Sequence, residues 1–178
     1  MGSIRAARHC DTLTSWAIDI ARSGTQDSII YEKIDLKDWP LPMDDEPGIP
    51  ALGVYAQPHT QAWSEKVREA AGFVWVTPQY NWGYPAPLKN ALDHLYDEWK
   101  GKPVVIVTYG GHGGSKCAGQ LKQVAAGLKM RVMPIQPQIT LTDAMIKGGA
   151  MTPESDFARY RRPLQRAFAK LEACLAKT

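Results

Sequence analysis

A short stretch in the middle of the chain has the side chains needed to hold a flat, partly polar ring. It follows the apolar run at 73–76 and reads TPQYNWGYPAPLKNALD over 77–93. Its first part, 77–84, supplies three aromatic rings and two amides (Tyr80, Trp82, Tyr84, Gln79 and Asn81). Three prolines and a glycine between residues 78 and 87 indicate an imposed backbone path. We therefore favour ligand binding over simple packing of these rings beneath a neighbouring segment.

The N-terminal segment GSIRAARHC has the composition of a phosphate-binding loop. It places Ser3, Arg5 and Arg8 directly before a predicted helix. Backbone N–H groups at a helix N-terminus, a hydroxyl and fork-shaped guanidinium groups together suit an anion. The segment has no GKS or GKT, so it is not a nucleoside-triphosphate loop. Taken alone, a frayed basic N-terminus is an equally good interpretation.

A third candidate is the glycine-rich loop YGGHGGS at 109–115, which follows the most apolar strand-like run of the chain. Its glycines do not fit the dinucleotide fingerprint GxGxxG. They permit close approach of backbone N–H groups to a ligand, and they equally permit a simple flexible turn. His112 in this loop is more typical of an exposed residue than of a proton donor.

No metal site is predicted. The acidic run at 44–46 lies in a proline-rich loop, and His94 is expected at a surface or interface. Cys10, Cys117 and Cys174 are far apart and form no CxxC pair, which favours a reducing compartment.

Alternating strands and helices surround these motifs. Strands are predicted at 28–35, 73–77, 103–108 and 131–141, the last at an edge because it contains Pro134 and Pro137. Helices are predicted at 11–23, 60–71, 88–99, 115–129 and from 152 towards 176, with a bend at Pro163. The long segment 38–58 is a loop. This order predicts an α/β fold, a parallel sheet with helices on both faces.

Length and composition predict one domain over 1–178. The chain has 178 residues, of which 44% are hydrophobic, enough for one core. A net charge of +3 with scattered basic residues does not indicate nucleic-acid binding. No apolar run is long enough for a membrane span and no signal peptide is evident, so we expect a cytoplasmic protein.

The three motifs in this order resemble the NAD(P)H-dependent FMN reductase family, over roughly residues 2–140. The pattern PQYNxGYPxxLKNAxD is specific, whereas GSxRxxR and YGGxGG give support. The resemblance implies a flavodoxin-like, doubly wound α/β/α domain that binds FMN and uses NADPH or NADH as co-substrate. It also implies a homodimer with helix 88–99 in the interface.

The resemblance also assigns site residues. Ser3, Arg5 and Arg8 match the loop that holds the FMN phosphate. Two further segments match the surroundings of the isoalloxazine ring, and their residues are Pro78, Gln79, Tyr80, Asn81 and Trp82, then Tyr109, Gly110, Gly111 and Gly113. Donors beside the ring tune its electronics, and no side chain is expected to act as nucleophile. The implied reaction passes hydride through the flavin to a quinone, free flavin, azo compound or similar acceptor.

One feature departs from the family pattern. A flavodoxin-like sheet has a central first strand that leads into the phosphate loop. Here Met1 stands directly before Gly2, so that strand is missing from the sequence. We therefore expect low stability and weak FMN binding. Two alternatives remain: a flavodoxin-like electron carrier, disfavoured by the two arginines and the positive charge, and a cofactor-free interaction protein.

Overall fold

The computed structural model describes residues 1–24, 29–43 and 45–177. Within them the sheet has four parallel strands: β1 (Phe73–Pro78), β2 (Pro103–Gly110), β3 (Arg131–Val132) and β4 (Gln138–Thr140). β2 is central, since it pairs with β1 along one edge and with β3 and β4 along the other. β2 is rich in valine and buried along most of its length, as expected for a strand covered on both faces.

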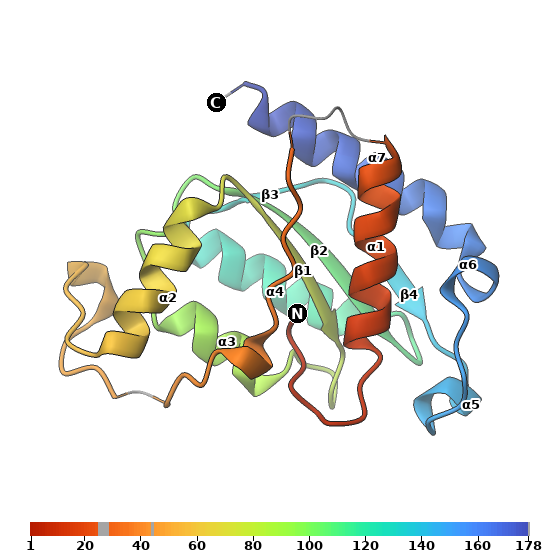
Figure 1. Cartoon of the computed structure of the whole chain (residues 1–178), viewed down its shortest axis with the longest axis horizontal. Helices are drawn as coiled ribbons and strands as arrows, with labels where there is room; N and C mark the ends of the chain where they lie inside the picture. Colours follow the sequence, from red (N-terminus) through yellow and green to blue (C-terminus); the bar gives the residue numbers. More distant parts are fainter. Residues whose placement is uncertain (25–28, 44, 178) are drawn as a thin grey trace.

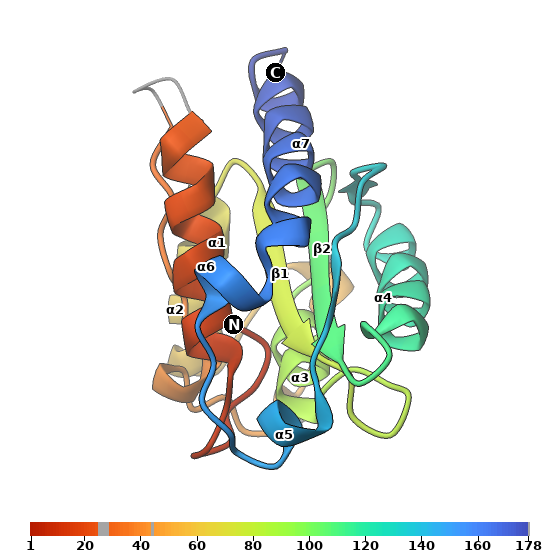
Figure 2. The same cartoon turned by 90° about the vertical axis from the view of Figure 1, so that its right-hand side faces the viewer.

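Helices cover both faces of the sheet (Figures 1 and 2). α1 (Cys10–Gly24) and α7 (Ala158–Leu175) pack in one core, and α2 (Pro58–Glu69), α3 (Ala86–Asp93) and α4 (Ser115–Gly127) pack in the other. Short helices complete the described chain: η1 (Leu36–Asp38), η2 (Pro50–Leu52), α5 (Asp143–Ile146) and α6 (Pro153–Asp156). Among the helices described, none has the length and apolar character needed to cross a membrane. The predicted three-layer α/β/α architecture is confirmed.

Among the described residues, the outer edge of β1 pairs with very little of the chain. Val76 O accepts a hydrogen bond from Gly2 N (2.9 Å), and the Met1 amino group donates to Ile34 O (2.6 Å). Met1 and Gly2 thus bridge β1 and the segment before η1, where a central strand would end. Above them lies a mainly apolar cavity of about 520 Å³ between β1, α1, α2 and residues 29–36.

The predicted strand at 28–35 is wrong for residues 29–35, which have no regular secondary structure, and residue 28 lies outside the described chain. The apolar pattern is present, but a strand also needs a ladder partner. Among the described residues, no neighbouring strand supplies one. The chain here instead runs irregularly along the cavity.

Three other elements end differently from expectation. α3 ends at Asp93 rather than 99, and Glu98 Oε2 accepts a bond from Tyr96 N (3.3 Å) in the turn that follows. The strand predicted at 131–141 is divided into β3 and β4 by the segment that contains both prolines. The C-terminal helix is interrupted at Phe157, a buried residue with φ −118°, while Pro163 lies inside α7.

Candidate flavin site

The three sequence motifs meet at the carboxyl edge of the sheet (Figure 2). Ser3 Oγ and the Tyr80 hydroxyl lie 2.8 Å apart, which joins the N-terminal loop to the loop after β1. Gln79 N donates to Tyr109 O (2.9 Å), which joins the loop after β1 to the start of the glycine loop. Ligands of open parallel sheets bind at this edge, outside the carboxyl ends of the strands.

The N-terminal loop is held in place by close packing at its start. A Cβ added to Gly2 would lie 2.6 Å from Thr77 Oγ1, so a larger residue does not fit without movement. Ser3 is fully buried, whereas Arg5 extends outward with its guanidinium carbon 3.7 Å from the centre of the Tyr80 ring. The loop therefore presents Arg5 beside the aromatic turn.

Arg8 carries the strongest indication of an anion-binding role. Its Nη2 forms an ion pair with Asp35, and the side chain is 12% exposed. Its Nη1 is buried and has no hydrogen-bond partner among the described residues. A buried, unpaired donor on a guanidinium is costly, and a phosphate oxygen would satisfy it. The residues present thus fit the phosphate of FMN.

Asp35 contacts the candidate site through Arg8, and the sequence reasoning missed it. Besides pairing with Arg8, its Oδ1 accepts a bond from Lys37 N (3.0 Å) and so caps η1. The available signal was an acid at the end of an apolar run, where the chain returns to the carboxyl edge of the sheet.

The aromatic turn has a strained backbone. Tyr80 and Gly83 exchange two backbone hydrogen bonds (2.9 and 2.8 Å), which encloses a two-residue turn at Asn81 and Trp82. Both central residues have positive φ, 46° and 69°. Asparagine tolerates this conformation, but tryptophan is rarely found in it. Trp82 is nonetheless 65% exposed, so the turn presents its ring instead of burying it.

Replacing Trp82 should separate stability from flavin binding. A left-handed conformation costs a non-glycine residue roughly 1–2 kcal/mol, partly offset by the greater unfolded-state freedom of glycine. We expect Trp82→Gly to leave the free energy of unfolding unchanged or raise it by up to about 1 kcal/mol, while FMN retention falls. Urea unfolding and flavin absorbance of the purified protein measure both. Trp82→Phe, which keeps a ring, should retain FMN; marked destabilisation by Trp82→Gly would instead show a packing role.

Gln79 has a structural role that the sequence did not reveal. Its Oε1 accepts hydrogen bonds from Lys116 N and Cys117 N, each 3.1 Å, and so caps the N-terminus of α4. Pro78 beside it is buried at the end of β1.

Burial raises the pKa of the Cys117 thiol to about 12, so this thiol is not a nucleophile at neutral pH.

The first residue of the glycine loop, Tyr109, is buried, whereas Gly111 and His112 are exposed to solvent. Tyr109 is 3% exposed, and burial, followed by interaction with Cys10, raises the pKa of its phenol above the ordinary value. Its ring therefore belongs to the core beneath the site. Gly111 and His112 are exposed, and Gly113 has φ 69° with an added Cβ only 3.2 Å from Gln138.

The segment after β4 also borders the site, although no motif marked it. His9 Nε2 lies 2.7 Å from Met145 O, which attaches α5 to the N-terminal loop. An added Cβ at Gly111 would lie 3.3 Å from Ile146 Cδ1, so α5 also borders the glycine loop. The only local signal was Thr142, whose hydroxyl caps α5 by accepting from Met145 N (3.3 Å).

The chain has a three-layer α/β/α fold with a parallel sheet. At the carboxyl edge of that sheet lie an aromatic turn and an arginine whose buried donor suits an anion. These features define a flavodoxin-like, flavin-binding class of protein. The family model of NADPH-dependent FMN reductases matches residues 1–142, and the chain belongs to this family. It is an oxidoreductase whose cofactor is FMN and whose reductant is NAD(P)H.

Known relatives agree with this assignment. An NAD(P)H-dependent FMN reductase of Schizosaccharomyces pombe is 54% identical over 172 residues, 96% of this chain and 85% of that protein. A quinone reductase of Escherichia coli is 31% identical over 75% of this chain and 70% of its own length. Among solved structures, the flavoenzyme NAD(P)H:(acceptor) oxidoreductase FerB from Paracoccus denitrificans matches the fold with a TM-score of 0.68 at 20% identity, covering 99% and 94% of the two chains.

Proposed function

We propose that the chain passes hydride from NADPH or NADH through bound FMN to a quinone, a free flavin, an azo compound or a similar acceptor. A quinone is the first acceptor to test, because a 31% identical relative is named a quinone reductase. The observation that supports cofactor binding at this edge is the buried Arg8 Nη1, which has no partner in the described chain.

The roles we propose for the side chains follow from their positions. Arg8 and the N-terminus of α1 hold the phosphate. Ser3, buried and bonded to Tyr80, positions the phosphate loop, and Arg5 lies beside that loop. Residues 78–82 hold one side of the ring, with Trp82 exposed at the turn. The loop at 109–113, through the backbone of Gly110, Gly111 and Gly113, lies along the ring's polar edge. N–H donors there stabilise negative charge that develops on the ring.

No side chain is required as a nucleophile. When bound, FMN supplies the hydride-accepting and hydride-donating chemistry. The protein binds the cofactor, orients it and leaves one face open to nicotinamide and acceptor in turn. His112 is exposed on the loop and is given no proton-transfer role.

The test is direct. Purified protein should be yellow, and it should bleach anaerobically when NADPH or NADH is added and regain colour with a quinone. A yellow protein that does not react with either nicotinamide would be an electron carrier instead. A colourless protein that fails to take up added FMN would contradict the flavin site itself.

Three further properties are proposals of the same kind. Residues 1–178 form one FMN-binding domain, the protein is cytoplasmic, and it forms a homodimer. The apolar stripe of residues 88–99 packs within the chain itself: Leu88, Ala91, Leu92, Leu95 and Trp99 are all buried. An interface through this segment would therefore rely on its exposed residues, such as Asp93 and Asp97.

A further inference from the structure

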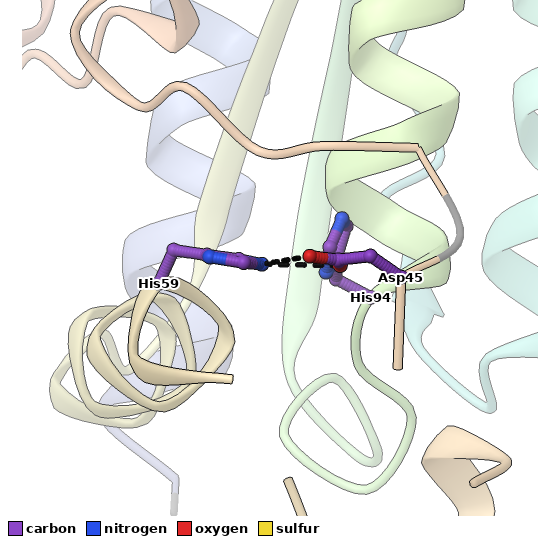
Figure 3. Close-up of side chains that lie close together, drawn as sticks. All are labelled: Asp45, His59 and His94. Atoms are coloured by element: carbon purple, nitrogen blue, oxygen red, sulfur yellow. Dashed lines mark hydrogen bonds and ion pairs between the residues drawn. The ribbon is translucent and has the colours of Figure 1, made fainter. Parts of the chain in front are cut away.

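Away from the flavin site, three potential metal ligands from separate segments point towards one another (Figure 3). Asp45 belongs to the long loop after η1, His59 to the first turn of α2, and His94 follows the last residue of α3. One ligand atom from each lies within 4.8 Å of the other two. We propose that these residues bind a divalent transition-metal ion of the Zn²⁺ type.

The donor set suits such an ion. Imidazole nitrogen and carboxylate oxygen are common zinc ligands, at about 2.0–2.2 Å from the metal. Tetrahedral coordination at those lengths places ligand atoms roughly 3.3 Å from each other. His59 Nε2 and Asp45 Oδ2 lie 3.0 Å apart, joined by a proton that the ion would displace on entering between them. All three ligand atoms lie within 4.8 Å of one another, so the remaining spacings would shorten by at most about 1.5 Å.

The hydrogen bonds of His94 select the tautomer that a metal ligand requires. Its Nε2 lies 2.8 Å from Pro42 O, a carbonyl that can only accept, so Nε2 carries a proton. In the neutral ring the lone pair is then on Nδ1, which lies 3.0 Å from the Thr60 hydroxyl. Ligating histidines commonly donate their other N–H to a backbone carbonyl in this way. A metal would replace the Thr60 hydroxyl as the partner of Nδ1.

The prediction that His94 is a surface or interface residue is wrong, since it is 6% exposed. Asp45 and His59 are more open, with side chains 29% and 28% exposed. An ion therefore approaches through Asp45 and His59 and meets His94 at the inner end. This leaves a coordination position for water on the outer side.

The loop that carries Asp45 is held against α2 before any ion binds. Glu46 accepts hydrogen bonds from Ala56 N (2.8 Å) and Gln57 N (3.0 Å), and Gln57 Nε2 donates to Asp45 O (3.1 Å). The ligands are thus partly pre-organised, which lowers the entropic cost of binding. A bound ion would cross-link the loop to α2 and to the end of α3.

The experiment measures Zn²⁺ binding to the full chain by isothermal titration and thermal unfolding. We expect one Zn²⁺ per chain, and Tm raised by roughly 5–10 °C at about 100 times Kd. Asp45→Asn and His59→Gln should each weaken binding at least about tenfold. His112→Ala and Cys174→Ser are matched controls for other zinc-binding side chains, and they should bind Zn²⁺ as the parent does.

Two outcomes would overturn the proposal. Zinc affinity that is the same in the parent, Asp45→Asn and His59→Gln would assign the ion to another place. Absence of Zn²⁺ binding, with a lower Tm in His59→Gln, would show a purely structural hydrogen-bond cluster. Because no flavin is involved in either readout, both outcomes are independent of the proposed reductase activity.

Discussion

An apolar extension of about eight residues before Met1 should raise the free energy of unfolding by at least about 3 kcal/mol, or roughly 6–12 °C in Tm. The physical reason lies along the outer edge of β1. Because Val76 O faces Gly2, strand alternation directs the N–H and C=O of Val74 to the same side. Within the described chain these Val74 groups have no backbone partner there.

The cavity beside β1 would accommodate an added strand. It is about 520 Å³ in volume and lined mainly by apolar side chains of α1, α2 and β1. Thr14 also lines it, and the Thr14 hydroxyl is buried without a partner among the described residues. A strand placed here would bury apolar area at about 25 cal/mol per Å² and complete two backbone ladders.

The pH dependence of stability gives a second test of the extension, because it reports on the amino group of Met1. In a protein made to begin at Met1, burial lowers the pKa of this group below its usual value of about 8. The unfolded chain then binds the proton more tightly, so stability rises as pH increases from the lowered pKa to about 8. The extension replaces the amine with a peptide N–H, and this pH dependence should disappear.

The measurement is urea unfolding of both proteins from pH 6 to 9, together with FMN retention on gel filtration. A Gly/Ser extension of equal length is the control, because it removes the terminal charge without filling the cavity. It should abolish the pH dependence but gain little stability. An apolar extension that improves neither the free energy of unfolding nor FMN retention would show that the cavity is not a strand site.

The elements that sequence patterns predicted well are those whose pattern depends on burial alone. β1 and β2 are continuous apolar runs, and both lie where expected. The run at 29–35 also carries apolar residues, Ile29, Ile30, Tyr31 and Ile34, but forms no strand. A segment forms a strand only when a neighbouring segment supplies the backbone hydrogen bonds of the ladder. The composition of one segment does not show whether that neighbour is present.

For the candidate site, the sequence predicted which loops meet but not the contacts between distant segments. The order of motifs brought the three loops to one edge, and the structure joins them through Ser3, Tyr80 and Gln79. What could not be foreseen are contacts between segments far apart in sequence, such as Arg8 with Asp35 or Gln79 with α4. Nor did sequence separate the exposed Trp82 from the buried Tyr109, since both are aromatic residues close to strand ends.

Arg8→Ala should abolish the protein's preference for FMN over riboflavin, which lacks the phosphate. Truncating one member of a buried, hydrogen-bonded charge pair costs about 2–5 kcal/mol, so FMN affinity should fall by roughly 30-fold or more. Riboflavin affinity should change little, since the ring site at 78–82 is intact. Quenching of flavin fluorescence on titration measures both constants.

The comparison of the two ligands is needed because Arg8 also stabilises the fold. Removing it leaves Asp35 with a side chain only 15% exposed and without its cation, so Arg8→Ala lowers Tm whether or not a phosphate binds. Asp35→Asn separates the effects: it breaks the same ion pair but leaves the guanidinium. If Arg8 holds the phosphate, Asp35→Asn keeps the FMN preference despite a lower Tm. Loss of FMN and riboflavin binding in parallel, in both variants, would assign Arg8 a structural role only.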